Sequence, residues 1–224
     1  SFRTLLRDPR VGNPPSLLQG DGQMLAQLAK GIESIRAQQP TPWPNPDRKT
    51  DVFITTTLLS PEHSRFTDDY GTELEDTDHH GQFHFTETTL PTAGTTASTG
   101  AALALAARSS ASFPLAFEPS FLPFTGDDTD ATHPDMSDYA NTTRSHWAAD
   151  GGLLVNRPLA PMLQTIFDRA ADRQVRRCLL YVTPTTGSPA SGDKATLSAP
   201  LDLAGALLRD AGAVLNQSIA ADLA

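Results

Sequence analysis

A carboxylate followed directly by two glycines is the feature of this sequence with the clearest chemical potential. Asp150 precedes Gly151 and Gly152, shortly before a run of apolar residues. Paired glycines let the backbone adopt positive φ and let another group approach closely. A carboxylate positioned at such a turn can accept a proton from a hydroxyl group, as a general base does. A non-catalytic aspartate in a turn has the same sequence signature, and these residues alone do not distinguish the two interpretations.

The residues after this turn predict the elements that position it. Asn156 and Pro158 are suited to a helix N-terminus, and apolar side chains continue at helical spacing to Ala170. Residues 178–182 form a short apolar run, typical of a strand buried on both faces of a parallel sheet, in which Cys178 would pack as a small hydrophobe. The pattern predicts a strand–helix–strand unit with a right-handed crossover, and it places Asp150 beside the sheet.

Composition and periodicity predict further elements on the N-terminal side. They are a helix at 21–38, a strand at 51–59, a hairpin excursion at about 60–90 and a helix at 101–108. Phe83 and Phe85 alternate with polar residues, which is typical of a half-exposed strand. Residues 125–146 are acidic and polar and are expected to form a mobile, solvated loop, since they lack the regular ligand ladder of a calcium loop.

The predicted hairpin holds the cluster of histidines and carboxylates Asp76, Asp78, His79, His80 and His84. Carboxylate and imidazole groups are suitable metal ligands. The spacing matches no known ligand signature, however, and alternation on a half-exposed hairpin explains it equally well. A metal site therefore stays an alternative, and no metal or cofactor is expected.

A second segment, residues 107–119, passes from helix-forming residues to small residues and then to aromatic residues separated by prolines. Small residues there would let a helix end pack closely against a site. The aromatic side chains are suited either to an apolar wall around an acyl group or, more commonly, to the core. The phenylalanines concerned are Phe113, Phe117, Phe121 and Phe124.

Composition limits the classes of function. The chain has 224 residues, a net charge of −9 and a single cysteine. The acidic balance argues against nucleic acid as a partner, and one cysteine excludes an internal disulfide framework. No apolar stretch approaches the roughly 20 residues of a membrane span. The chain starts with Ser1 rather than with methionine or a signal peptide, which predicts a fragment or a processed product with a cytoplasmic or membrane-peripheral location.

Two separated segments together resemble the patatin-like phospholipase family. Residues 107–119 are similar to the family segment Arg-x-Ser-small-Ala-x-Pro-x-x-Phe-x-Pro, and residues 150–158 are similar to its Asp-Gly-Gly/Ala…Asn-x-Pro block. The run from Asp51 to Phe85 also resembles a bacterial patatin-related branch. The resemblance covers roughly residues 1–185, and residues 186–224 are expected to be a linker and the start of a helical segment.

The resemblance implies an α/β fold of three layers, an α/β/α sandwich, and hydrolysis of lipid acyl esters by a Ser–Asp dyad. Asp150 matches the dyad base, and the matching segment gives substrate-binding candidates: Ser109, Ser110, Phe113, Pro114 and Phe117. A Gly-x-Ser-x-Gly nucleophile elbow is missing, because the nearest segment, residues 96–100, lacks the first glycine. The family's glycine-rich oxyanion loop is missing as well.

The sequence therefore predicts the C-terminal part of a patatin-like catalytic domain, inactive alone, which needs an upstream segment that carries the nucleophile. Its expected partners are that segment, a lipid or acyl-ester substrate and a peripheral membrane surface. A non-catalytic lipid- or protein-binding module with the same fold is the first alternative. A metal-dependent hydrolase that uses Asp76, Asp78, His79 and His84 is the second.

Overall fold

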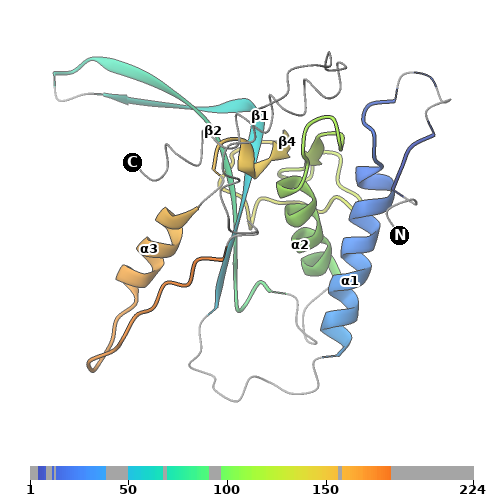
Figure 1. Ribbon diagram of the computed structural model, residues 1–224. Coiled ribbons are helices and arrows are strands. Elements are labelled where there is room, and N and C mark those ends of the chain that lie inside the picture. The colour runs from blue at the N-terminus through green and yellow to red at the C-terminus, as the bar shows by residue number, and fades with distance from the viewer. Residues whose placement is uncertain are drawn as a thin grey trace, which may run out of the picture.

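The computed structural model describes residues 5–8, 12, 14–38, 50–67, 70–90, 97–155 and 158–182. It is a mixed α/β structure built on one four-stranded antiparallel sheet, with the strand order β2-β1-β4-β3 (Figure 1). The strands are β1 (Asp51–Thr67), β2 (Glu73–Thr86), β3 (Ser120–Leu122) and β4 (His146–Asp150).

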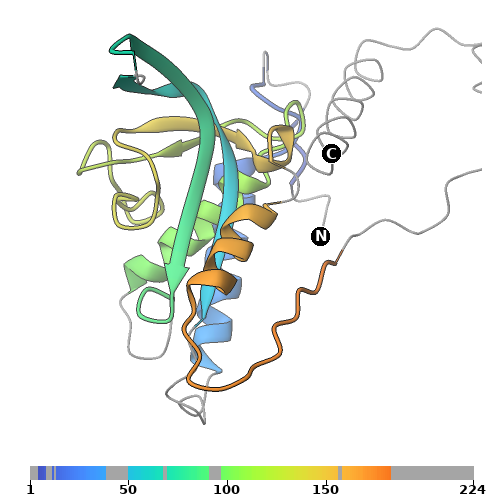
Figure 2. The same cartoon turned by 90° about the vertical axis from the view of Figure 1, so that its left-hand side faces the viewer.

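The hairpin of β1 and β2 is the longest feature of the sheet and extends well beyond the helices (Figures 1 and 2). It confirms the predicted strand at 51–59 and the predicted hairpin, although β1 continues further than expected, to Thr67. The predicted alternation on β2 is also confirmed, since Phe83 and Phe85 are 1% and 0% exposed. Their neighbours His84 and Gln82 point to the opposite face of the sheet.

The helices lie on both sides of this sheet. A π-helical turn (Gly20–Leu25) leads into α1 (Ala26–Ala37), which packs beside α2 (Ala97–Ser110) on one side. Helix α3 (Leu159–Asp168) lies on the other side (Figures 1 and 2). The helices predicted at 21–38 and 101–108 are confirmed, and so is the helix after the paired glycines. None of the helices in the described part of the chain combines the length and apolar character that crossing a membrane requires.

The core lies between the sheet and the α1–α2 pair. Alanines of α2 are completely buried, and these short side chains let the helix approach the sheet closely. Met136, from the acidic segment predicted as a mobile loop, is 1% exposed and belongs to this core. Its backbone N–H donates to the Pro123 carbonyl at 3.0 Å, so the segment is anchored at its centre.

The predicted strand at 178–182 is wrong, and so is the parallel sheet it would have joined. Residues 169–182 have no strand pairing, with Leu180 and Val182 85% and 79% exposed. Cys178 is exposed rather than packed in a core. A run of this kind becomes a buried strand only when other strands and helices cover it, and nothing in the described segments does so. The sheet that forms instead is antiparallel throughout.

A hydrogen-bonded pair, the buried His146 and the partly exposed Glu62, joins the irregular part of the β1–β2 hairpin to the start of β4. Nε2 of His146 lies 2.7 Å from Oε1 of Glu62, which also accepts the Thr143 N–H at 2.9 Å. Burial alone would raise the pKa of Glu62, but the hydrogen bonds from Thr143 and His146 outweigh it and lower the pKa from 4.5 to about 2. The ionised carboxylate therefore stabilises the folded state.

Acid should weaken the fold through this carboxylate. Because the pKa of Glu62 is lower in the folded state, its contribution is complete above pH 4.5 and is lost as the pH falls towards about 2. We expect Glu62→Gln to remove about 1–2 kcal/mol of the free energy of unfolding at neutral pH, after allowance for solvent screening, and to flatten its pH dependence. Urea unfolding between neutral and acidic pH measures both effects. The exposed Glu73→Gln is the matched control, and an equal pH dependence in the two variants would contradict the assignment.

Candidate functional site

Asp150 is the last residue of β4, and three segments fix its backbone. It lies opposite Thr56 of β1 in the register of the two strands. Its N–H donates to the Ser112 carbonyl beyond the end of α2 at 3.0 Å, and its carbonyl accepts the Thr57 hydroxyl at 2.9 Å. The carboxylate thus lies at the C-terminal end of β4, next to the 107–119 segment.

The Asp150 side chain caps the short 3-10 turn Gly151–Leu153. Its Oδ1 accepts the Gly152 N–H at 2.7 Å. Burial raises the pKa of the Asp150 carboxyl above its ordinary value, while the Gly152 hydrogen bond opposes the rise. No cation in the described segments forms an ion pair with it, so the carboxylate has a greater affinity for a proton than an exposed aspartate has.

Gly151 is required by a close approach rather than by its φ angle. A Cβ at this position would lie 2.2 Å from the Thr55 carbonyl oxygen of β1, a backbone atom that cannot rotate away. The glycines with positive φ in the described segments are Gly71 and Gly126, so the positive φ considered for the paired glycines is not used. The absent side chain lets the turn beside Asp150 pack directly against β1.

Gly151→Ala should therefore destabilise the protein. We expect a loss of about 1–3 kcal/mol in the free energy of unfolding, because overpacking forces the turn away from β1. Gly31→Ala in α1 is the matched control, since nothing lies within 4 Å of its Cβ position. That variant should instead stabilise the helix by about 0.5–1 kcal/mol. Chemical denaturation of both variants measures the difference, and effects of the same sign would refute the packing argument.

Behind this turn, the guanidinium of Arg108 is completely buried. It donates to the Ser112 hydroxyl and, at 2.8 Å, to the Glu118 carbonyl. Its Nε faces Asp21 Oδ1 at 3.2 Å as an ion pair without hydrogen-bond alignment. The ring of Phe117 lies 5.5 Å below the guanidinium carbon. Ser112 is the shared residue, because its hydroxyl binds Arg108 and its carbonyl binds Asp150.

The Glu118 carboxylate completes the Arg108 cluster. It accepts the Ser16 hydroxyl at 2.5 Å and the N–H groups of Gly20 and Asp21 at 2.9 and 3.0 Å. Burial alone would raise the pKa of Glu118, but these hydrogen bonds and Arg7 lower it to about 2. Gly20 leaves room for the cluster, since a Cβ there would lie 1.8 Å from Arg108 Nη2. The cluster ties the segment before α1 to the segment that holds Asp150.

The comparisons with known proteins give one long relative. Over 232 residues, 98% of this chain is 49% identical to "Uncharacterized membrane protein Rv3479" of Mycobacterium tuberculosis. The chain spans 21% of the length of that relative, so it corresponds to one part of a much longer polypeptide. No protein-family model matches the chain, and no solved structure matches it.

Of the five residues predicted to contact substrate, Ser109 is not accessible and the other four are partly exposed. Ser109 is completely buried, and its hydroxyl donates to the Leu105 carbonyl at 2.8 Å, so it is occupied within α2. Ser110, Phe113, Pro114 and Phe117 are half-buried. Of this segment, Ser112 makes the direct backbone contact with Asp150.

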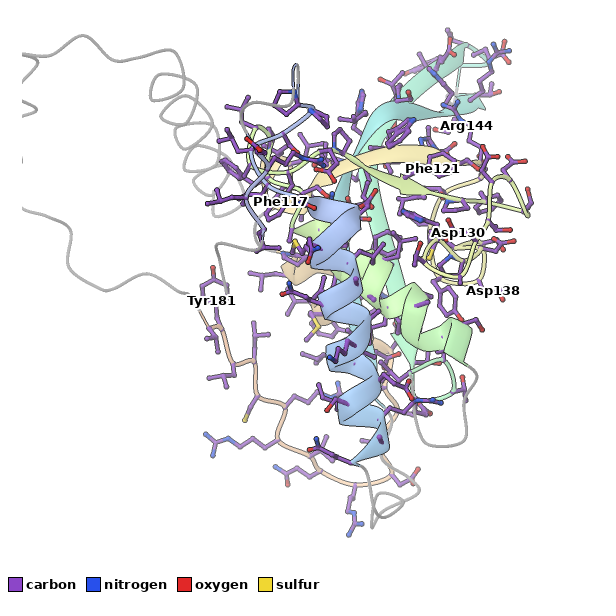
Figure 3. The ribbon with its side chains drawn as sticks, turned by 90° about the vertical axis from the view of Figure 1, so that its right-hand side faces the viewer. Phe117, Phe121, Asp130, Asp138, Arg144 and Tyr181 are labelled. Carbon is purple, nitrogen blue, oxygen red and sulfur yellow. The ribbon has the colours of Figure 1, made fainter. Side chains whose placement is uncertain are left out.

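Of the phenylalanines for which an apolar wall or the core was expected, Phe117 and Phe121 lie apart from each other. Phe117 lies against Arg108, whereas Phe121 packs against Trp147 across β3 and β4 with ring centroids 5.2 Å apart. Figure 3 shows Phe117 and Phe121 at separate places on the molecule. The aromatic residues that fill the core are Phe83 and Phe85 of β2.

The histidines of the hairpin also have separate partners. His80 Nδ1 binds Asp78 at 2.5 Å, His84 Nε2 binds Asp51 at 2.9 Å, and His79 Nδ1 lies 2.7 Å from the Leu58 carbonyl. No group of three or more potential ligands converges in the described part of the chain. The geometry therefore gives the metal-dependent alternative no support.

No role was expected for Arg108, Ser112 or Glu118 from the sequence. The available signal was a charged residue on the core-facing side of an alanine-rich helix, since such a residue is buried only when it is paired. The expected helix cap Asn156 lies outside the described residues, as does the segment 186–224.

Proposed function

We propose that this chain forms part of a patatin-like serine acyl hydrolase and supplies the general base of its Ser–Asp dyad, Asp150. The supporting observation is a half-buried carboxylate with a raised pKa, fixed at the end of a strand. The residue after it must be glycine, because a side chain at position 151 would collide with the backbone of β1. A base of this kind needs a pKa raised towards the working pH and a fixed position. The three-layer sandwich and the lipid or acyl-ester substrate belong to this proposal.

The nucleophile would come from another segment of the polypeptide. In the described segments no serine hydroxyl is hydrogen-bonded to the Asp150 carboxylate, and the Ser112 hydroxyl is engaged with Arg108. A relative about five times as long as this chain has room for such a segment. Docking of that segment would also cover the exposed apolar side chains of α3 and residues 179–182, of which Phe167 is 74% exposed.

Complementation of activity tests the proposal. The chain alone, and the chain co-expressed with the segment that precedes it in its coding region, are assayed with a p-nitrophenyl ester of a medium-chain fatty acid. We expect hydrolysis only from the combination, because a base without a nucleophile and an oxyanion hole gives little rate enhancement. Hydrolysis by the chain alone, or none by a folded combination, would refute the proposal.

A second candidate is a non-catalytic lipid- or protein-binding module. The exposed apolar side chains on α3 and the following segment favour it, since a patch of this kind marks an interaction surface. The word "membrane" in the name of the relative is compatible with peripheral membrane contact. Flotation with liposomes separates the candidates: a module binds lipid without the upstream segment and without hydrolysis, and binding is unchanged by Asp150→Asn.

A further inference from the structure

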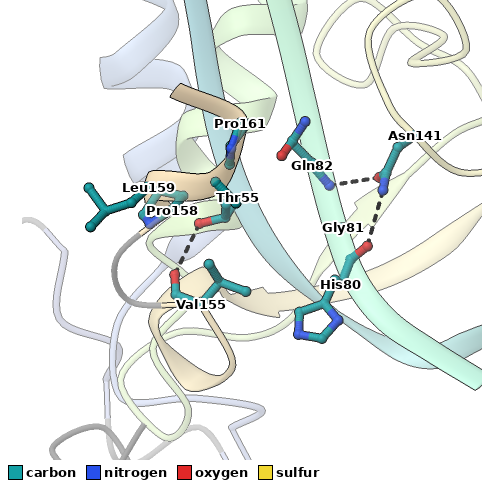
Figure 4. A pocket seen from close by; sticks show the side chains of 10 residues that line it. Thr55, His80, Gly81, Gln82, Asn141, Val155, Pro158, Leu159 and Pro161 are labelled. Atoms are coloured by element: carbon teal, nitrogen blue, oxygen red, sulfur yellow. Dashed lines mark hydrogen bonds between the residues drawn. The ribbon is translucent and has the colours of Figure 1, made fainter. Parts of the chain in front are cut away.

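A pocket lies on the α3 side of the sheet, next to the turn that follows Asp150. Its volume is about 330 Å³, at the lower end of the range for small-molecule sites. It lies between β1, β2 and the start of α3 (Figure 4). Thr55 lines it, whereas the next residue, Thr56, is buried on the core side of β1 opposite Asp150. Because successive side chains of a strand alternate in direction, the pocket and the Asp150 side chain lie on opposite faces of the sheet.

One wall of this pocket is apolar, and the other carries hydrogen-bonding groups. The apolar wall comes from Val155, which follows the 3-10 turn, and from Pro158, Leu159, Ala160 and Pro161 at the start of α3. The polar wall comes from the sheet and a neighbouring loop, with Thr55, His80, Gln82 and Asn141. Among the described residues that line the pocket there is no Lys, Arg, Asp or Glu. A charged ligand would therefore lose hydration without gaining a partner among these residues.

Gln82 provides the polar wall with a side chain that can hydrogen-bond to a ligand. Its side chain extends across the pocket towards Pro161 (Figure 4), and its carboxamide has no hydrogen-bond partner among the described residues. The neighbouring groups are held in place: Asn141 Oδ1 accepts the Gln82 backbone N–H at 2.7 Å, and the Thr55 hydroxyl donates to the Val155 carbonyl at 3.4 Å. A carboxamide presents one donor and one acceptor side by side, which match those of another carboxamide.

We propose that this pocket binds a small neutral ligand with a carboxamide group on an apolar ring, with the carboxamide paired to Gln82 and the ring against Leu159 and Pro161. A ring of this kind fits the volume and buries its apolar surface on the α3 wall. The proposal does not rest on the proposed hydrolase function, because neither Asp150 nor the turn Gly151–Leu153 lines the pocket, although Thr55 and Val155 contact Gly151.

Benzamide is the probe for this site, with the ¹⁵N-labelled chain observed by NMR. We expect shifts of the Gln82 side-chain amide and of the backbone around residues 80–82 and 155–161, with a dissociation constant of about 1 mM, as for a ligand of this size. Toluene and benzoate should bind at least about tenfold more weakly, because they lack the paired donor and acceptor. Binding of toluene as tight as that of benzamide would overturn the carboxamide assignment.

Two variants locate the site. Gln82→Leu should weaken benzamide binding at least about tenfold, while Gln27→Leu on the exposed surface of α1 should leave it unchanged. Ala160→Trp, a change in α3 rather than in the sheet, should abolish binding by filling the pocket from the helix side. The backbone spectrum of each variant shows whether it is folded. Unchanged binding by either folded variant, or no shift of wild-type resonances at about 10 mM benzamide, would overturn the proposal.

Discussion

Replacing Arg108 with alanine is expected to lower the free energy of unfolding by about 3–5 kcal/mol, because it removes the completely buried cation that two partly buried carboxylates share. Arg108 is completely buried, and it lies 3.2 Å from Asp21 and 3.7 Å from Glu118. The change also removes the hydrogen bonds to the Ser112 hydroxyl and the Glu118 carbonyl. Urea or thermal unfolding of the two proteins measures the loss.

An exposed pair on α1 provides the matched control. Arg36 forms an ion pair with Glu33 at 2.6 Å, three residues away on the same helix, in contact with solvent. Because such surface pairs contribute little, Arg36→Ala should cost less than about 1 kcal/mol. Amide exchange gives a second reading: Gly20 and Asp21, whose N–H groups donate to Glu118, should exchange faster in Arg108→Ala than in Arg36→Ala. Equal stability and equal exchange in the two variants would show that the cluster does not hold this segment.

The elements predicted correctly are those whose signals are local. The alternation of Phe83 and Phe85 on β2 and the apolar periodicity of α1 and α3 are properties of a few neighbouring residues. Each such pattern indicates which face of the element is apolar, and in most cases another element of the fold packs against that face. The location of Asp150 at the end of a strand was predictable in the same way, since the paired glycines follow it directly.

The failures concern partners that are distant along the chain. The apolar run 178–182 has the composition of a buried strand, but composition does not say which strand lies beside it. The Arg108 cluster joins residues 16–21 to residues 108–118, and no local pattern indicates that pairing. The requirement for Gly151 has the same origin, because the obstructing atom belongs to Thr55.

The second large effect concerns the proposed base. In the chain complemented by its upstream segment, Asp150→Asn should lower ester hydrolysis by about 10²–10⁴-fold, the usual contribution of a general base. The fold should be retained, because the carboxamide oxygen can still accept the Gly152 N–H that Oδ1 accepts at 2.7 Å. Steady-state rates with the p-nitrophenyl ester measure the loss, and thermal unfolding confirms the fold.

The pH profile distinguishes a base from a structural aspartate. A general base must be deprotonated, so kcat/KM should fall as the pH falls through the pKa of Asp150, which burial raises above its ordinary value of 3.8. The residual activity of Asp150→Asn should lack this acid limb, because a carboxamide does not titrate. Asp168→Asn on the exposed side of α3 is the matched control and should keep both the rate and the limb. Activity of Asp150→Asn within about tenfold of wild type, with the limb intact, would remove Asp150 from the mechanism and leave it as the cap of the 3-10 turn.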